Sequence, residues 1–368
     1  MSDERKVVLV IGPLPPPYHG GAVATSYVLG TQSTVQRRLL HLDTTDRRGL
    51  LNIGTVDAGN VLLALRHAAQ LLVMLVRERP GVVYLPMAQN TLGVLRDCVL
   101  AVLALSLRAR LVVHLHGSGF RAFHDAAPPP LRAPVRMILR RARRVIVLGE
   151  SLRFMLEGIV PPKSVAVLPN GTEDLFADAP HRRAGGGPVR LLYLGNLMVA
   201  KGFPEVLEAA VVLVRDGEDV ELHVAGAFTS AAERARAAEW LERLGSAVTL
   251  HGVVAGEAKR QLLLDADLFV FPSHSEGHPY VILEAMAAGL PIVATRLSTI
   301  EETIVDGESG VLVPPGKPAE LAQALRALIR NPARRCELGR AARRRFESRY
   351  SLDRWSAGLD QILTAAAE

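Results

Sequence analysis

Short runs of apolar, largely β-branched residues recur along the chain and are separated by longer stretches with helical periodicity. The first half has five such runs, at residues 6–11 (KVVLVI), 82–85, 111–115, 145–148 and 165–168. Continuous apolar runs of this length are typical of strands buried on both faces of a parallel sheet. Their alternation with helices predicts a doubly wound α/β domain over residues 1–172.

The pattern is interrupted at residues 173–188 and then begins again. This stretch has no periodicity and contains three consecutive glycines, so we interpret it as a linker. A second α/β domain is predicted over residues 189–350, with strands at 189–194, 220–224, 248–250, 268–271, 292–294 and 311–313. Two such domains facing each other would make one cleft between them.

Three helices have apolar patterns that bear on this organisation. In the last helix, 351–368, Leu352, Trp355, Leu359 and Ile362 share one face, and we expect that face to pack back on the first domain. The helices at 59–77 and 92–108 are the most apolar. Charged residues interrupt both, so neither offers the ~20 uninterrupted apolar residues of a membrane span. We expect both to be buried core helices.

Composition indicates a globular protein, and the net charge permits anionic partners without identifying one. The chain has 368 residues, of which 49% are hydrophobic and 22% charged, which is typical of a globular protein. A net charge of +6 permits anionic partners such as nucleotides or membrane surfaces. Cys98 and Cys336 match no metal-ligand spacing. The N-terminal MSDERKVVLVIG lacks the pattern of a signal peptide, and we expect a cytoplasmic protein.

Candidate chemistry lies in the loops that follow the predicted strands, because ligands of open parallel sheets bind at the carboxyl ends of the strands. Gly20 and Gly21 precede a predicted helix, where a backbone can approach an anion closely, although a tight turn explains them equally well. His116 stands at a strand end, where it could contact a hydroxyl or serve a structural role. His114 should point the same way but lie deeper.

Two loops of the second domain carry stronger signals. Lys201, in LGNLMVAKG, precedes a predicted helix and could place its charge on a diphosphate, although surface lysines are usually only solvated. In SHSEGHPYVILEAMAAGLP, Glu276 falls in a strand-end loop, Pro279 in the first turn of a helix and Glu284 inside that helix. Two carboxylates beside a helix N-terminus suit a ligand with hydroxyls at both ends and negative charge between them.

These motifs together resemble the retaining glycosyltransferases of family 4. The block EGHPYVILEAMAAGLPIVA, residues 276–294, is similar to the E-x7-E signature of that family, and LGNLMVAKG, HLHGSGF, VLPNGTE and the HGG of the first loop support it. The resemblance implies the GT-B fold, with two facing Rossmann-like domains, and transfer of a sugar from a nucleotide-sugar such as a UDP- or GDP-hexose. It implies no metal and no other cofactor.

The resemblance also implies a role for each candidate residue. Glu284 would hold the ribose, Lys201 the diphosphate, and Gly20 and Gly21 would approach the phosphates. The residues expected at the transferred sugar and at the base are His116, Glu276, Gly277, His278, Pro279, Tyr280 and Val253. Many members have arginine where this chain has Asn196, so another cation, for example Arg121, would have to assist Lys201.

The acceptor and several rival functions stay open at this stage. The acceptor would be a glycan or a lipid-linked hydroxyl in cell-envelope, exopolysaccharide or glycolipid synthesis. The arginines of Arg132–Arg144 could contact an anionic membrane or could simply be solvated. The main alternative is a catalytically silent nucleotide-sugar-binding protein. Nucleic-acid binding would require aromatic stacking platforms, and an aromatic content of 5% does not favour it.

Overall fold

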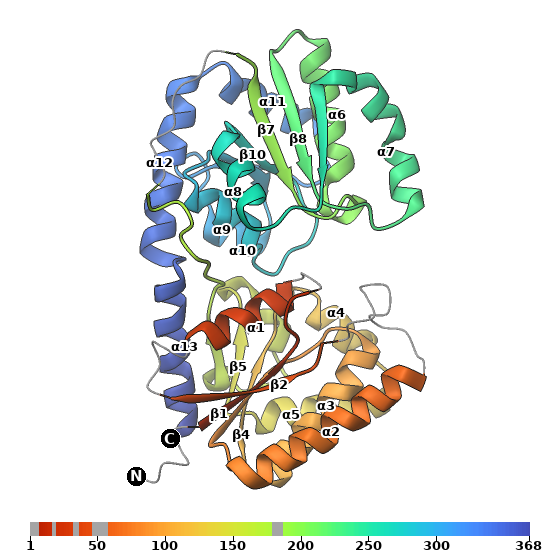
Figure 1. The fold of residues 1–368 in the computed structure, drawn as a ribbon, viewed down its shortest axis with the longest axis vertical. Coiled ribbons are helices and arrows are strands. Elements are labelled where there is room, and N and C mark those ends of the chain that lie inside the picture. The colour runs from red at the N-terminus through yellow and green to blue at the C-terminus, as the bar shows by residue number, and fades with distance from the viewer. Residues whose placement is uncertain (1–6, 17–19, 32–36, 46–57, 179–186) are drawn as a thin grey trace. The chain divides into compact units, whose positions relative to one another are not determined.

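The computed structural model describes residues 7–16, 20–31, 37–45, 58–178 and 187–368. The chain divides into two compact units. Unit 1 consists of Met1–Asn170 together with Leu352–Glu368, and unit 2 consists of Gly171–Ser351. Each unit is built on its own sheet of six parallel strands. Figure 1 shows the two sheets, each with its own helices.

The sheet of unit 1 has the strand order β2-β1-β3-β4-β5-β6. Its strands are β1 (Val7–Gly12), β2 (Arg38–Asp43), β3 (Val82–Pro86), β4 (Arg110–His114), β5 (Arg144–Val147) and β6 (Val165–Val167). All five predicted strands are confirmed. The sequence analysis missed β2, whose RLLHLD has no continuous apolar run. An edge strand has a neighbour on one side only, and β2 is correspondingly less buried than β1.

Helices cover both faces of this sheet, and side chains of β1 alternate between them. Val8 and Val10 pack with α1 (Gly20–Gly30) and α13 (Leu352–Ala367), whereas Leu9 and Ile11 pack on the opposite face. That opposite face is covered by α2 (Ala58–Glu78), α3 (Thr91–Ser106) and α5 (Pro129–Arg141). Shorter helices are α4 (Phe120–Ala126), η4 (Glu150–Leu156) and η5 (Pro162–Ser164).

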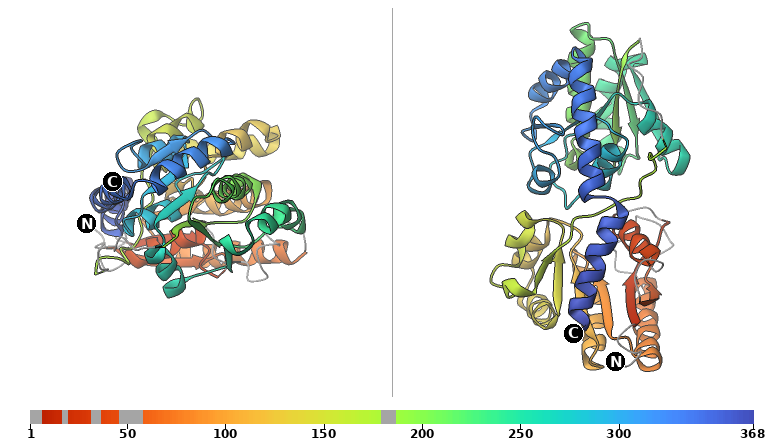
Figure 2. Two further views of the ribbon diagram at one scale, coloured as in Figure 1. Left: turned by 90° about the horizontal axis from the view of Figure 1, so that it is seen from above. Right: turned by 90° about the vertical axis from the view of Figure 1, so that its left-hand side faces the viewer.

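The C-terminal helix α13 belongs to unit 1, as expected from its apolar stripe. Trp355, Leu359 and Leu363 are buried against the sheet, while Leu352 and Ile362 are partly buried beside them. The right-hand view of Figure 2 shows α13 running along unit 1. Arg37 ties the helix further by donating to Asp360 Oδ1 and Thr364 Oγ1.

The prediction that 59–77 and 92–108 form buried core helices is wrong for α2 and only half right for α3. In α2, His67, Leu71 and Leu75 are buried, but six large aliphatic residues are exposed. In α3, Asp97 and five apolar residues are buried, while Leu95, Val99 and Val102 are exposed. Hydrophobic periodicity could not reveal this difference, because α2 is apolar on more faces than the sheet covers.

Unit 2 has the strand order β12-β11-β10-β7-β8-β9, and all six of its predicted strands are confirmed. They are β7 (Val189–Leu194), β8 (Val220–Ala225), β9 (Val248–Gly252), β10 (Leu268–Phe271), β11 (Ile292–Thr295) and β12 (Val311–Val313). The helices are η6 (Val199–Lys201), α6 (Phe203–Arg215), α7 (Ala231–Leu244), η7 (Gly245–Ala247), α8 (Gly256–Asp265), α9 (Tyr280–Ala287), α10 (Ser298–Thr303), α11 (Pro318–Ile329) and α12 (Pro332–Arg349).

The predicted linker, 173–188, is described in part. Phe176 is buried in the core of unit 2, and Asp174 forms an ion pair with Arg343 of α12. These residues are therefore part of the packed body of unit 2. Residues 179–186 lie outside the described part of the chain.

Candidate functional site

The loop after β7 and the loop after β10 meet at the carboxyl edge of the unit 2 sheet. The Lys201 Nζ lies 2.7 Å from the Glu276 Oε1, so two residues 75 positions apart form an ion pair. The Glu276 side chain is only 9% exposed, whereas that of Lys201 is 29% exposed. The backbone supports this meeting, because Ala200 O accepts from the N–H of His274 and the hydroxyl of Ser273.

Gly202 is required for the loop that carries Lys201. Its φ is +69°, a left-handed conformation that L side chains rarely adopt. A Cβ at this position would lie 1.9 Å from the carbonyl oxygen of Pro272, at the end of β10. The two loops can approach this closely only because residue 202 has no side chain.

The Tyr193 hydroxyl holds the same loop through backbone carbonyls. Its buried hydroxyl donates to Asn196 O at 2.9 Å and lies 3.3 Å from Lys201 O. Burial raises the Tyr193 pKa well above its ordinary value, and the negative charge of Glu276 adds to this effect. The phenol therefore stays protonated and can act as a donor. The sequence analysis did not identify this residue, because a tyrosine within a strand looks like a core residue.

A second lysine–glutamate pair lies at the other end of the E-x7-E spacing. The Lys259 Nζ, on α8, lies 2.5 Å from the Glu284 Oε1. The Glu284 side chain is 12% exposed, and its Oε2 is buried without a hydrogen-bond partner in the described part of the structure. The sequence analysis missed Lys259, since a lysine on an amphipathic helix is usually only solvated.

The two glutamates flank the N-terminus of α9. This helix starts at Tyr280, and Pro279 is its N-cap rather than a first-turn residue as predicted. Gly289, with a φ of +68°, follows the end of the helix. Gly277 therefore lies in the loop and Glu284 within the helix, as the spacing predicted. The helix N-terminus adds partial positive charge between the two carboxylates.

His278 is buried beside this helix and cannot easily carry a charge. Its Nε2 lies 3.0 Å from the hydroxyl of Thr303 on α10. Burial lowers the pKa of His278 to about 3, so the imidazole is neutral near pH 7. His278 therefore helps to position the loop and does not supply a cation there.

Asn196 and Val253 also lie in loops at the carboxyl edge of the unit 2 sheet. Asn196 follows β7, and its backbone carbonyl accepts the Tyr193 hydroxyl. Val253 follows β9 and is 74% exposed. Beside it, His251 Nε2 and His223 Nδ1 lie 3.0 Å apart. The loops after β7, β9 and β10, which carry these candidates, thus share one edge of unit 2.

The remaining candidates belong to unit 1. Gly20 and Gly21 form the first residues of α1 rather than preceding it, and a Cβ at Gly20 would meet no atom within 4 Å. His116 lies two residues beyond β4, and its ring centroid is 3.8 Å from that of His114. The two rings therefore lie together, as their spacing predicted.

Both histidines are neutral near pH 7, and His114 is buried whereas His116 is half-buried. Tyr84 OH lies 2.6 Å from His114 Nδ1, whereas both ring nitrogens of His116 are buried without a partner in the described part of the chain. Burial lowers the pKa of His116 to about 4, and it lowers that of His114 as well. His116 has the hydrogen-bonding capacity to contact a ligand without adding positive charge.

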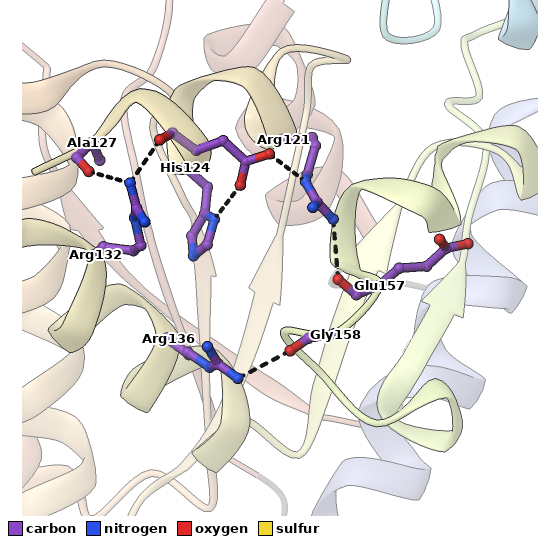
Figure 3. A network of polar contacts seen from close by, with 8 residues as sticks. Arg121, His124, Ala127, Arg132, Arg136, Glu157 and Gly158 are labelled. Carbon is purple, nitrogen blue, oxygen red and sulfur yellow. Dashed lines mark hydrogen bonds and ion pairs between the residues drawn. The ribbon is translucent and has the colours of Figure 1, made fainter. Parts of the chain in front are cut away.

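Arg121, the predicted helper of Lys201, is already engaged within unit 1. It pairs with Asp125 and donates to Glu157 O (Figure 3). Several arginines of the predicted cluster are engaged in the same way. Arg132 donates to the carbonyls of Asp125 and Ala127, and Arg136 to that of Gly158, as the same figure shows. Arg140 donates to Ile159 O.

Unit 1 also contains a cavity whose lining includes none of the predicted site residues. It has a volume of about 1040 Å³ and lies between the end of β2 and α2. Its polar lining includes Asp43, Arg66 and Gln70. Within the described ranges, no group of three or more His, Cys, Asp or Glu side chains is placed to hold a metal ion.

Two glycosyltransferase family models match this chain, one in each unit. Residues 188–331 match the family described as "Glycosyl transferases group 1", and residues 52–174 match the one described as "Glycosyltransferase Family 4". The Mycobacterium tuberculosis protein named "Glycogen synthase" is 29% identical over 237 residues, covering 62% of this chain and 56% of that relative.

A second relative agrees with this assignment, and a solved structure shares the fold. The Mycobacterium leprae protein named "Phosphatidyl-myo-inositol mannosyltransferase" is 31% identical over 229 residues, covering 60% of this chain and 57% of the relative. The chain thus matches little more than half the length of these relatives. Anabaena HepE, solved in complex with UDP-glucose, has a TM-score of 0.75 at 18% identity, covering 97% of this chain and 99% of that one. This likeness shows the shared fold.

Proposed function

Because the chain belongs to the glycosyltransferases, with a family 4 domain followed by a group 1 domain, we propose that it is a retaining hexosyltransferase that uses a nucleotide-sugar donor. The observation that carries the proposal is the pair of lysine–glutamate contacts at the carboxyl edge of the unit 2 sheet. Lys201–Glu276 and Lys259–Glu284 place two cations and two hydrogen-bond acceptors around the N-terminus of α9.

Each part of this arrangement fits one part of a donor. Glu284 has a buried oxygen without a partner among the described residues, which suits a ribose hydroxyl. Glu276 would accept hydroxyls of the transferred sugar, and Lys201 would bind the diphosphate. In the free protein the Lys201 ammonium forms an ion pair with Glu276. We expect the diphosphate of the donor to replace part of this ion pair on binding.

Lys259 accounts for the absence of a charged side chain at Asn196. Arginine at that position, as in many family members, would place a second cation near the diphosphate, and asparagine cannot supply charge. Lys259 contacts Glu284 directly, and it is 27% exposed at the edge of the same site. We assign it the supporting positive charge, which makes Arg121 unnecessary for this purpose.

The proposed reaction transfers the sugar with retention at C1. Cleavage of the bond from C1 to the diphosphate places negative charge on the leaving group, which Lys201 and the α9 N-terminus stabilise. The acceptor hydroxyl attacks from the face of the leaving group, and a phosphate oxygen takes its proton. Glu276 is a poor candidate for a covalent nucleophile, because its carboxylate is already bound to Lys201 and faces the sugar hydroxyls.

We propose further that the reaction needs no metal ion, since lysine and helix charges supply the electrophilic stabilisation. Within unit 1, His116 would contact a hydroxyl as a neutral group, and the backbone at Gly20 and Gly21 would allow close approach of an anion. The acceptor would be a hydroxyl of a glycan or of a lipid-linked glycan. The setting we propose is cytoplasmic assembly of an exopolysaccharide, cell-envelope polymer or glycolipid.

A donor screen followed by product analysis tests the proposal. Thermal-shift measurements with UDP-, GDP- and ADP-sugars should raise the Tm with one nucleotide class. With that donor and a hydroxyl acceptor, nuclear magnetic resonance of the product should show the anomeric configuration of the donor. An inverted product would contradict the retaining mechanism.

The same experiment separates an enzyme from the alternative, a catalytically silent nucleotide-sugar-binding protein. A silent binder would give the thermal shift and release no nucleoside diphosphate with any acceptor. The presence of Lys201, Glu276, Glu284 and His116 together favours the enzyme.

A further inference from the structure

The exposed apolar side chains of the molecule are concentrated on two neighbouring helices. Among described residues, fourteen large hydrophobic side chains are exposed, and ten of these belong to α2 and α3 or to the residue that caps α3. They are Val61, Leu62, Leu65, Leu72, Val73, Val76, Leu95, Val99, Val102 and Leu107. We call these ten residues the aliphatic face. With each side chain about half exposed, the face amounts to roughly several hundred Å², a size that usually marks an interaction site.

The residues of α2 that belong to this face form one continuous stripe. At about 100° per residue, positions 61, 62, 65, 72, 73 and 76 fall within an arc of roughly 120°. The buried residues His67, Leu71 and Leu75 lie on the opposite side. From Val61 to Val76 the stripe extends about 22 Å along the helix axis. Leu62 and Leu65 are the most exposed, at 68% and 63%.

The helix lies against the protein rather than standing apart from it. Residues 59–78 are long and apolar enough to cross a membrane by length and composition, and only 17% of the most apolar window is buried. However, Leu71 and Leu75 pack into the core of unit 1 beside α3. Figure 1 shows α2 and α3 covering the same face of the sheet. This arrangement suits contact with an apolar surface along the side of the helix.

The charged side chains of the helices around the aliphatic face are mostly positive. The segments 58–79, 91–110 and 129–144, which contain α2, α3 and α5, have twelve arginines but only two acidic residues. Both acidic residues are paired, Glu78 with Arg38 and Asp97 with Arg96. On α2, Arg66 and Arg77 border the exposed stripe directly.

Exposed arginines also follow the ends of these helices. Each helix ends where the next strand begins, so Arg79, Arg108, Arg141 and Arg143 lie at the same edge of the sheet. Positive charge is expected at helix C-termini, but two of these arginines adopt a costly conformation. Arg79 and Arg108 have φ values of 43° and 61°, where glycine is the usual residue. Both positions thus carry an exposed cationic side chain where glycine would relieve the backbone strain.

From this combination we propose that the aliphatic face docks on the surface of an anionic lipid bilayer. Leucine and valine would enter the boundary between headgroups and acyl chains, while the bordering arginines would bind lipid phosphates. A second copy of the chain fits less well, because its arginines would meet the same positive charge. The face also has no exposed aromatic residue, the residue type enriched in protein interfaces.

This proposal changes the role of the arginine-rich segment. Arg132, Arg136 and Arg140 donate to carbonyls of their own unit, so they would not by themselves form a free basic patch. The hydrophobic contact comes from α2 and α3 instead, and α5 contributes the charges at its end.

Vesicle sedimentation of the full chain tests the proposal. The protein should pellet with vesicles of phosphatidylcholine and phosphatidylglycerol in equal parts, and far less with phosphatidylcholine alone. Replacing Leu62, Leu65 and Leu72 by serine should lower the partition coefficient about ten-fold or more. The matched control replaces Phe154, Leu175 and Leu250, three exposed apolar residues elsewhere, and should bind like the unaltered chain.

The arginines allow a test with two opposite readouts. Replacing Arg79 and Arg108 by glycine removes the backbone strain, so the Tm should stay level or rise. The same change should lower partition onto anionic vesicles severalfold. A purely structural role for these arginines would leave vesicle binding unchanged.

A fluorescent label reports the contact directly. One protein carries Leu65→Cys and Cys336→Ser, so that an environment-sensitive dye labels residue 65. The dye emission should shift to the blue when anionic vesicles are added. The control is the unaltered chain labelled at its natural Cys336, which is exposed on α12, and its dye emission should not shift. The proposal fails if both leucine and control triples bind alike, or if no vesicle binds. It fails equally if the leucine triple variant abolishes only a dimer seen by light scattering.

Discussion

At the scale of single residues, the candidate site rests on two lysine–glutamate ion pairs. Lys201 meets Glu276, and Lys259 meets Glu284, with both glutamates nearly buried and both lysines more exposed. The position of Lys201 and Glu284 was predictable, because strand ends and helix starts can be read from sequence. Lys259 was not, since only the fold brings residue 259 to residue 284.

The two lysines should differ in their effect on the reaction. Lys201→Ala should lower kcat/KM about 100-fold to 1000-fold, because the leaving-group charge loses its main cation. Lys259→Ala should mainly raise the KM for the donor. Steady-state kinetics would check both, with the exposed Lys317→Ala as a matched control. Equal and small effects of all three changes would contradict the roles assigned here.

A buried histidine gives a pH dependence of known sign. The His278 pKa is about 3 in the folded chain and near its ordinary 6.5 when unfolded, so the unfolded state binds more protons in between. Its contribution to stability is therefore present above pH 6.5 and is lost as the pH falls toward 3. Between pH 7 and pH 5 the loss should be about 2 kcal/mol. Denaturant titrations of the chain and of His278→Gln should show a flatter dependence in the variant.

At the scale of elements, the strands were predicted almost completely and the helices less well. Buried parallel strands are continuous apolar runs, so eleven of twelve could be located, whereas the edge strand β2 could not. The periodicity of α2 indicated a helix but not how much of it the sheet would cover. Which apolar stripe is buried depends on the neighbours, and those are set by the fold.

Contact between elements gives a prediction for the loop that carries Lys201. Gly202→Ala should cost about 2 kcal/mol or more and weaken donor binding, because the new Cβ would strike the carbonyl of Pro272. Gly217 is the matched control, since its φ is +81° and a Cβ added there would meet no atom within 4 Å. Gly217→Ala should cost only about 1 kcal/mol. Equal losses in the two variants would show that the clash with Pro272 does not matter.

At the scale of the whole molecule, the two α/β domains followed from the repeated alternation of strands and helices, and the GT-B fold followed from the family resemblance. The C-terminal helix belongs to unit 1 although it follows unit 2 in the chain. Its apolar stripe indicated that it needed a partner, and the expectation that this partner is the first domain is confirmed. Substrate choice could not be predicted in this way, because it depends on loops whose shape the fold determines.

The proposed use of lysine and helix charge predicts the response of the complete enzyme to chelation. Incubation with EDTA should leave the transfer rate within about two-fold of its starting value, since no step is assigned to a metal ion. Rate measurements before and after dialysis, with and without added Mg²⁺ or Mn²⁺, would check this. A rate that is lost on chelation and restored by one cation would overturn the proposed metal independence.

Calorimetric titration of the donor provides the most direct test of the central claim, that both lysine–glutamate pairs of unit 2 hold one nucleotide-sugar. The donor identified by thermal shift would be titrated into the unaltered chain, Lys201→Ala, Lys259→Ala and the double variant. The account predicts weaker binding in each single variant and a double-variant loss that differs from their sum, because both lysines act on one ligand. Donor binding of unchanged affinity in the double variant would contradict it.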